Sequence, residues 1–155
     1  MMRGNRIREN VIPDWSTDEW KGNIVLNEKV RAFLEEKRFA VLATIKRDGS
    51  PQQTVMWYEL QGDRIMMNTA EGRAKAYNFR RDARVSICVE DEYRFVAISG
   101  KVELNEDREQ GLADIMRLAV RYHGADQAES MRAGFTKDQR VTMLMSIDNV
   151  VTNGF

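Results

Sequence analysis

Two short polar turns, each an aspartate beside a glycine, divide three apolar segments in the middle of the chain. Asp48-Gly49 separates the first segment from the second, and Gly62-Asp63 separates the second from the third. Such pairs between apolar runs favour tight hairpins, and a tight hairpin can join only antiparallel strands. The turns therefore predict an antiparallel sheet here and argue against a parallel α/β sheet.

The rest of the chain extends this pattern into a mainly β fold with flanking helices. Segments of strand length and apolar or alternating character lie at 39–46, 51–60, 64–69, 83–91, 94–104 and 140–147. Helices are predicted at 28–37, 73–81, 105–124 and 127–135. Six strands joined mostly by short turns, with few free edges, predict a small antiparallel barrel.

Two finer features follow from the same pattern. Gly100 lies inside the strand at 94–104 and indicates a β-bulge. The helix at 105–124 has an apolar face that should pack on the sheet, formed by Leu112, Ile115, Leu118 and Tyr122.

Length and composition limit the organisation and the classes of function. At 155 residues the chain predicts one domain at 27–155, preceded by an arm at 1–26 that contains Trp15 and Trp20. Basic and acidic residues balance, 24 against 24, so bulk charge indicates neither nucleic acid nor a membrane as partner. One cysteine and one histidine argue against a metal site of the usual zinc kind. No apolar run reaches transmembrane length and the first residues lack an apolar signal core, so we expect a cytoplasmic protein.

The segment at 69–82 gathers basic side chains directly after a strand. Gly72 permits a tight turn, and Arg73 and Lys75 then fall in the first turn of a helix. Cations there oppose the helix dipole, whereas an anion at the same place is favoured by the free N–H groups. With the hydroxyl of Thr69 nearby, the pattern predicts a phosphate site.

A plainer interpretation of the same segment stays open. Glu71 and Asp82 can act as counter-ions, and the segment is then only a solvated charged face. Arg80 and Arg81, near the carboxyl end of the predicted helix, suit the dipole and are expected to be structural.

The order of strands, turns and basic residues resembles that of the split β-barrel flavin-binding proteins, the superfamily that includes pyridoxamine 5′-phosphate oxidase. The resemblance extends over residues 28 to 147. It rests on "VLATIKRDGSPQ", "GRAKAYNFRRDARVSICVE" and "RFVAISGKVEL", which look most like the flavin/deazaflavin oxidoreductase branch. The oxidase pattern has two adjacent basic residues, whereas here Ala74 separates them, as in the deazaflavin branch. The resemblance implies a six-stranded antiparallel split β-barrel.

The resemblance also implies a cofactor and the residues that bind it. Many members of that branch use coenzyme F420, an 8-hydroxy-5-deazaflavin, and the alternative cofactor is FMN. The ring would lie along the strand that contains Gln53, Thr54, Val55, Met56 and Trp57. The cofactor's phosphate would lie at Asn68, Thr69, Arg73, Ala74 and Lys75.

Such proteins are usually homodimers with two cofactor sites at the interface. The resemblance therefore implies that a second chain completes each site, and Tyr93 and Arg94 are candidates for that contribution. Three functions stay open: a deazaflavin-dependent reductase of a small organic substrate, an FMN-dependent oxidase or reductase, and a protein that binds such a cofactor without catalysis. The sequence does not identify the catalytic residues.

Overall fold

The structure is a computed structural model that describes residues 24–155. Most of the predicted arm at 1–26, including Trp15 and Trp20, lies outside the described residues. The elements in chain order are α1 (Glu28–Glu35), β1 (Ala40–Ile45), β2 (Pro51–Met56), β3 (Glu59–Gln61), β4 (Arg64–Ala70), α2 (Ala74–Arg81), β5 (Arg84–Asp91), β6 (Arg94–Asn105), α3 (Arg108–His123), α4 (Ala125–Phe135), β7 (Arg140–Ser146) and β8 (Asn149–Asn153).

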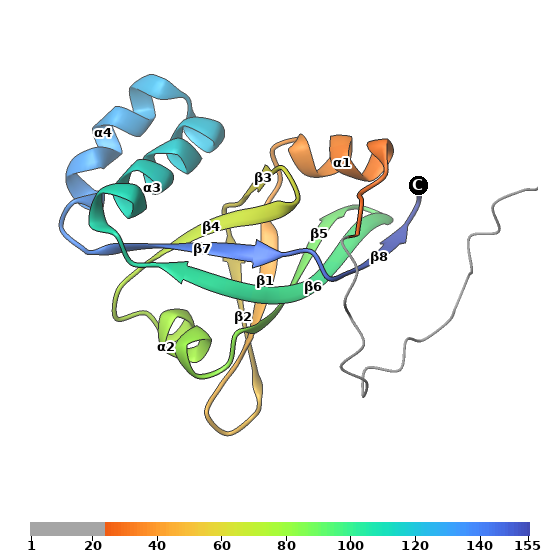
Figure 1. Ribbon diagram of the computed structural model, residues 1–155. Helices are drawn as coiled ribbons and strands as arrows, with labels where there is room; N and C mark the ends of the chain where they lie inside the picture. The colour runs from red at the N-terminus through yellow and green to blue at the C-terminus, as the bar shows by residue number, and fades with distance from the viewer. Residues whose placement is uncertain (1–23) are drawn as a thin grey trace, which may run out of the picture.

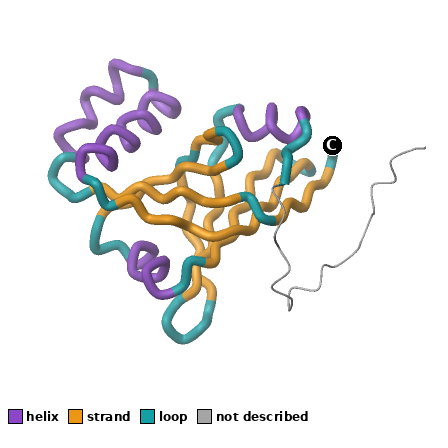
Figure 2. The backbone as a smooth tube through the Cα atoms, viewed as in Figure 1, coloured by secondary structure: helices purple, strands orange, loops and turns teal. Residues whose placement is uncertain are grey.

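The strands form one curled antiparallel sheet in the order β2-β1-β5-β6-β7-β4-β3, with β8 paired to β6 (Figure 1). The long strand β6 pairs with β5 and β8 through its first part and with β7 through its last part. The sheet thus bends back on itself around a core, and helices lie at its ends and on one side (Figure 2). The predicted antiparallel split barrel with flanking helices is confirmed.

The predicted number of six strands is too low, because residues 24–155 alone form eight. The predicted strand at 51–60 is broken at Trp57 and Tyr58, which separate β2 from β3. At this break the hydroxyl of Tyr122 takes the place of a strand neighbour, since it accepts a hydrogen bond from the Tyr58 N–H at 3.2 Å. The last strand, β8, is short and mixed in character, and its residues carry no clear alternation.

Gly100 does not form the predicted bulge. The pairing of β6 with β5 continues without interruption, with Val85 opposite Gly100 and Arg84 opposite Lys101. A Cβ atom at Gly100 would lie 1.9 Å from the carbonyl oxygen of Ser146. The glycine is therefore required by a close backbone approach, at the place where β6 turns from one half of the sheet to the other.

Two layers of apolar side chains hold the fold together. Inside the curled sheet, Leu42, Ile87, Ile98 and Met143 are almost fully buried. α1 closes one end of this core, and Asn27 caps the helix by accepting a hydrogen bond from the Val30 N–H at 2.9 Å.

On the other face of β4, α3 buries the apolar face that the sequence predicts. Ile115, Leu118 and Tyr122 pack on Met66, with Leu112 partly buried beside them. α4 in turn packs on α3 through Ala128. No helix within residues 24–155 has the length and apolar character needed to cross a membrane.

Candidate functional site

Three cations meet where β4 ends and both α2 and β7 begin. The antiparallel pairing of β4 with β7 places Ala70 opposite Arg140. Gly72, with φ of +83°, then turns the chain into α2, which has Arg73 as its N-cap and Lys75 in its first turn. Arg73, Lys75 and Arg140 are hereafter called the basic corner.

Lys75 and Arg140 of the basic corner are partly buried, whereas Arg73 is exposed. Burial lowers the pKa of Lys75, and the charges of Arg73 and Arg140 lower it further. Burial also lowers the pKa of Arg140, while Asp138 acts in the opposite direction. Among the ion pairs formed within residues 24–155, none involves a side chain of this corner. Partly buried charges without a partner are unfavourable, so the corner is suited to an external anion.

The two carboxylates that could have neutralised this segment are bound elsewhere. Glu71 accepts two hydrogen bonds from Arg80, at 2.8 and 2.7 Å, and Arg80 also contacts Glu106. These bonds lower the pKa of Glu71. Asp82 forms an ion pair with Arg84 at 2.7 Å.

The other two arginines of the segment, Arg80 and Arg81, form contacts within the fold, as the sequence predicts. Arg80 is held by two carboxylates, and Arg81 donates a hydrogen bond to the carbonyl oxygen of Ile45 at 2.6 Å. Of the two expected counter-ions, Glu71 therefore pairs with Arg80 and Asp82 pairs with Arg84, and neither forms an ion pair with Arg73, Lys75 or Arg81.

The predicted phosphate residues lie at this corner, but they do not play equal parts. Thr69 is buried at the end of β4, one residue before the turn. The side chain of Asn68 is engaged inside the fold, because its amide donates to the carbonyl oxygen of Gly111 at 2.9 Å and its oxygen accepts from Arg140. Ala74 is exposed as the first residue of α2.

The predicted ring-binding residues lie on an edge strand. β2 pairs with β1 alone within the described part of the chain, so the backbone groups on its other edge have no strand partner. Thr54 and Met56 share the inner face of the sheet with their partners on β1, whereas Gln53 and Val55 point outward and are exposed.

Helix α2 connects this edge strand with the basic corner. The amide of Asn78 donates to Thr44 on β1 at 2.9 Å and to Gln52 on β2 at 3.0 Å. These bonds place the second turn of α2, which follows the basic corner in the chain, beside the start of β2.

Trp57 follows β2 and belongs to a stack of aromatic side chains. Its ring lies parallel to that of Tyr122, with centroids 5.2 Å apart, and His123 approaches it edge-on. Phe39 covers the other side of Tyr122 at 5.5 Å and is 57% exposed. The stack fixes the orientation of Trp57 at the end of the predicted ring site.

An apolar row crosses the outer face of the sheet from β2 to β8. The register aligns Val55, Val41, Cys88, Ala97 and Val151 on five neighbouring strands. Val55 is 63% exposed and Val151 is 41% exposed. A row of this kind at a solvent face is typical of a surface that another protein chain covers.

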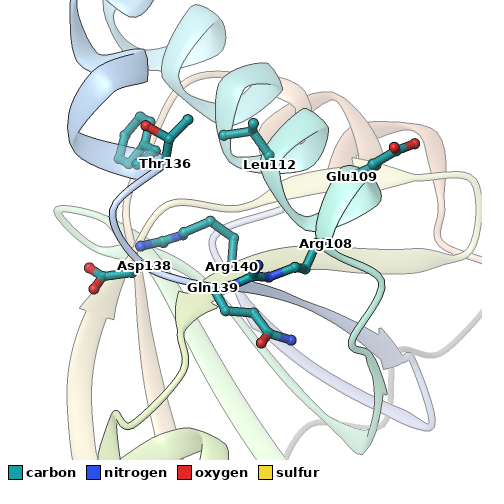
Figure 3. Close-up of a pocket in the computed structure, with 8 residues that line it drawn as sticks. Arg108, Glu109, Leu112, Thr136, Asp138, Gln139 and Arg140 are labelled. Atoms are coloured by element: carbon teal, nitrogen blue, oxygen red, sulfur yellow. The ribbon is translucent and has the colours of Figure 1, made fainter.

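A pocket of about 220 Å³ lies beside Arg140, between the first turn of α3 and the segment that joins α4 to β7 (Figure 3). It is lined by Arg108, Glu109, Leu112, Phe135, Thr136, Asp138, Gln139 and Arg140. Residues 24–155 contain no cluster of three acidic, histidine or cysteine side chains that could hold a metal ion.

Sequence reasoning missed Arg140. It is the first residue of the predicted strand at 140–147, and nothing in its neighbourhood marks it as a ligand. Its place beside Lys75 depends on the pairing of β7 with β4, and these strands lie about seventy residues apart in the chain.

Known proteins share this fold and the order of its elements. The family model described as pyridoxamine 5′-phosphate oxidase matches residues 26–151. A conserved hypothetical protein from Mycobacterium tuberculosis is 30% identical, with 85% of this chain and 87% of that one covered and a TM-score of 0.71. A structure described as an F420 reductase is 26% identical, with 81% and 98% covered and a TM-score of 0.67. General stress protein 26 from Bacillus anthracis, at 15% identity, 81% and 91% coverage and a TM-score of 0.62, shares the fold alone.

Proposed function

The chain belongs to the pyridoxamine 5′-phosphate oxidase family, and from that membership and the site we propose that it is an oxidoreductase. Its cofactor in this proposal is the deazaflavin F420, used as a hydride carrier to reduce a small organic substrate. The similarity to a protein described as an F420 reductase favours this cofactor over FMN, which is the second candidate.

The basic corner is the observation that carries the proposal. Two of its cations, Lys75 and Arg140, are half-buried, and the described residues offer them no ion pair. A phosphate would supply the missing negative charge, and the fork of Arg73 together with the N–H groups at the start of α2 would add hydrogen bonds. Both candidate cofactors carry a phosphate, so this corner supports the class of ligand and not the choice between the two.

The edge strand β2 supports the placement of the ring. Its free backbone groups can bond the polar edge of a three-ring cofactor, and the exposed side chains of Gln53 and Val55 can contact a ring face. A bound deazaflavin supplies two-electron hydride chemistry, and the protein contributes binding and orientation. The stack of Trp57 on Tyr122 holds one wall of the site in place. Hydride transfer by the cofactor therefore requires neither a nucleophile nor an acid–base pair from the protein.

We also propose a homodimer, in which the apolar row on the outer face of the sheet is covered by a second copy. Val55, on β2, belongs both to this row and to the predicted ring site, so a partner on this face would border the cofactor. Tyr93 is 88% exposed at the β5–β6 turn and is free to reach such a partner, whereas Arg94 is held by Asp91 at 2.5 Å. Of the two candidates for completing the partner's site, Tyr93 is the better placed.

Titration of the purified protein with F420 and with FMN tests the cofactor. We expect F420 to bind and FMN to bind more weakly, as measured by quenching of the cofactor's fluorescence. Preferential binding of FMN would move the assignment to the second candidate. Binding of either cofactor without turnover across a broad substrate panel would support a carrier rather than an enzyme. Absence of binding to both would refute the proposal.

Sedimentation velocity at micromolar concentration tests the dimer. Val151→Asp places a charge in the apolar row and is expected to produce monomers. Val120→Asp is the matched control, because Val120 is similarly exposed, at 46%, but lies on α3. A wild-type monomer that still binds cofactor would contradict the proposed interface.

A further inference from the structure

Arg140 is held by a chain of buried hydrogen bonds that leads away from the basic corner. Its Nε donates to Oδ1 of Asn68 at 2.9 Å. The Asn68 amide donates to Thr142 Oγ1 at 3.3 Å, and the Thr142 hydroxyl donates to Asp114 Oδ2 at 2.6 Å. Gln110 completes the chain by donating to Asp114 Oδ1 at 3.0 Å.

This chain fixes the direction of the Arg140 guanidinium and uses only one of its donors. Asn68, Thr142 and Asp114 are each less than a tenth exposed, so the chain has little freedom to rearrange. A second constraint comes from Phe135, whose ring centre lies 5.4 Å from the guanidinium carbon. The two outer nitrogens of Arg140 donate no hydrogen bond within residues 24–155. Arg140 lines the pocket between α3 and the α4–β7 segment together with Asp138 (Figure 3).

Such an arrangement differs from that of the other arginines near the site. Arg80, Arg84 and Arg117 are neutralised by carboxylates at 2.6 to 2.7 Å. Arg140 is anchored through a neutral amide, which orients its guanidinium. Asp138 is the carboxylate whose charge acts on Arg140, but the two form no ion pair within the described residues. A guanidinium that is oriented, half-buried and without an ion pair can bind two oxygens of an external oxyanion.

We propose that Arg140 is a direct ligand of the anion bound at the basic corner, and that Asn68, Thr142 and Asp114 are its positioning residues. The anion is a phosphate, held by Lys75 and Arg73 from α2 and by the outer nitrogens of Arg140 from β7. The proposal rests on the proposed function in so far as this phosphate belongs to the cofactor. The phosphate would then be bound from two sides, by side chains of α2 and of β7, which are far apart in the sequence and adjacent in the fold.

Inorganic phosphate tests the site without any cofactor. Phosphate is expected to raise the melting temperature of the wild-type protein, because it binds the folded state. In Arg140→Gln this increment should be largely lost, and it is measured relative to the variant's own melting temperature without phosphate, because Asn68 also loses its bond to Arg140. Arg84→Gln, which removes an arginine that already forms an ion pair with Asp82, should keep the full increment.

The conservative variant separates a positioned ligand from a simple charge. Arg140→Lys keeps the charge but loses the bond to Asn68 and the fixed fork. We expect it to retain only part of the phosphate increment. Thr142→Val, which breaks the chain one step away, should reduce the increment while Arg140 remains present. If Arg140 only stabilises the fold, Arg140→Gln should lower the melting temperature and leave the increase caused by phosphate intact, and this result would refute the inference.

Cofactors with and without their phosphate show whether the anion at this site is the cofactor's phosphate. The preference of the wild-type protein for FMN over riboflavin, or for F420 over its dephosphorylated form, should fall at least about tenfold in Arg140→Gln. Arg140→Gln could keep both the preference for the phosphorylated cofactor and the increase in melting temperature with phosphate, while Lys75→Ala loses both. That result would overturn the inference about Arg140 and leave the proposed cofactor unaffected. A phosphate increment that depends on Arg140 in a protein that binds no flavin would support the anion site and refute the cofactor alone.

Discussion

Lys75→Ala is the sharpest test of the basic corner. Lys75 is half-buried beside two other cations, so an anion bound there would interact with it in surroundings that screen charge less than open water. A charge-assisted contact of this kind contributes on the order of 1.5 to 3 kcal/mol to binding. At about 1.4 kcal/mol per decade, its loss should weaken cofactor affinity roughly tenfold to a hundredfold.

The assay compares phosphorylated and dephosphorylated cofactor by calorimetry or fluorescence titration. The loss in Lys75→Ala should be confined to the phosphorylated form. Arg80→Ala is the control, because Arg80 lies on the same helix but is occupied by Glu71 and Glu106. If Lys75→Ala keeps the wild-type preference for the phosphorylated form, the corner is not a phosphate site and the reasoning from its unpaired charges fails.

The same substitution should leave stability without ligand unchanged or increase it. The pKa of Lys75 is lowered from its ordinary value of 10.5, so the folded state holds this proton less tightly than the unfolded state. The charged side chain therefore disfavours folding at neutral pH, and this penalty is relieved as pH rises through the lowered pKa towards 10.5. Urea unfolding between neutral pH and about pH 10 should show a rise in stability from this group in the wild type that is absent in Lys75→Ala.

Two further substitutions test the packing that supports the site. Tyr122→Phe should cost about 1 to 3 kcal/mol of unfolding free energy, because the Tyr58 N–H loses its buried partner, and it should change the tryptophan fluorescence through Trp57. Denaturant curves that superimpose on those of the wild type would contradict the part assigned to this hydroxyl. Gly111→Ala should destabilise by about 1 to 3 kcal/mol, because its Cβ would lie 2.2 Å from the Arg140 carbonyl oxygen. Gly134→Ala on α4, where nothing lies within 4 Å of the added Cβ, should instead be neutral or gain up to about 1 kcal/mol, and equal effects at the two glycines would refute the close approach.

The parts of the fold that depend on neighbouring residues could be predicted from the sequence. The turn at Gly62 and the apolar face around Leu118 are local patterns, and both lie where the sequence places them. The break at Tyr58 could not be predicted, because the hydroxyl that replaces the missing strand partner comes from Tyr122 on a distant helix.

The candidate site divides in the same way. Arg73 and Lys75 could be identified because turn, helix start and charge are adjacent in the sequence, although their binding of an anion remains a prediction. Arg140 could not be found, because only the pairing of β4 with β7 brings it to the corner. Nor could the sequence show that Glu71 prefers Arg80, since both interpretations of the segment contain the same residues.

The change of partners along β6 determines how this protein should unfold. One half of the sheet pairs with residues 94–101 of this strand, and the other half pairs with its residues from Val102 onward. Between the two halves, the Lys101 N–H donates a hydrogen bond to the hydroxyl oxygen of Ser146 at 3.0 Å. Neither half can lose β6 without removing a central strand from the other. The domain should therefore melt in a single cooperative transition, and the amide protons near the crossing should exchange with solvent only through global opening.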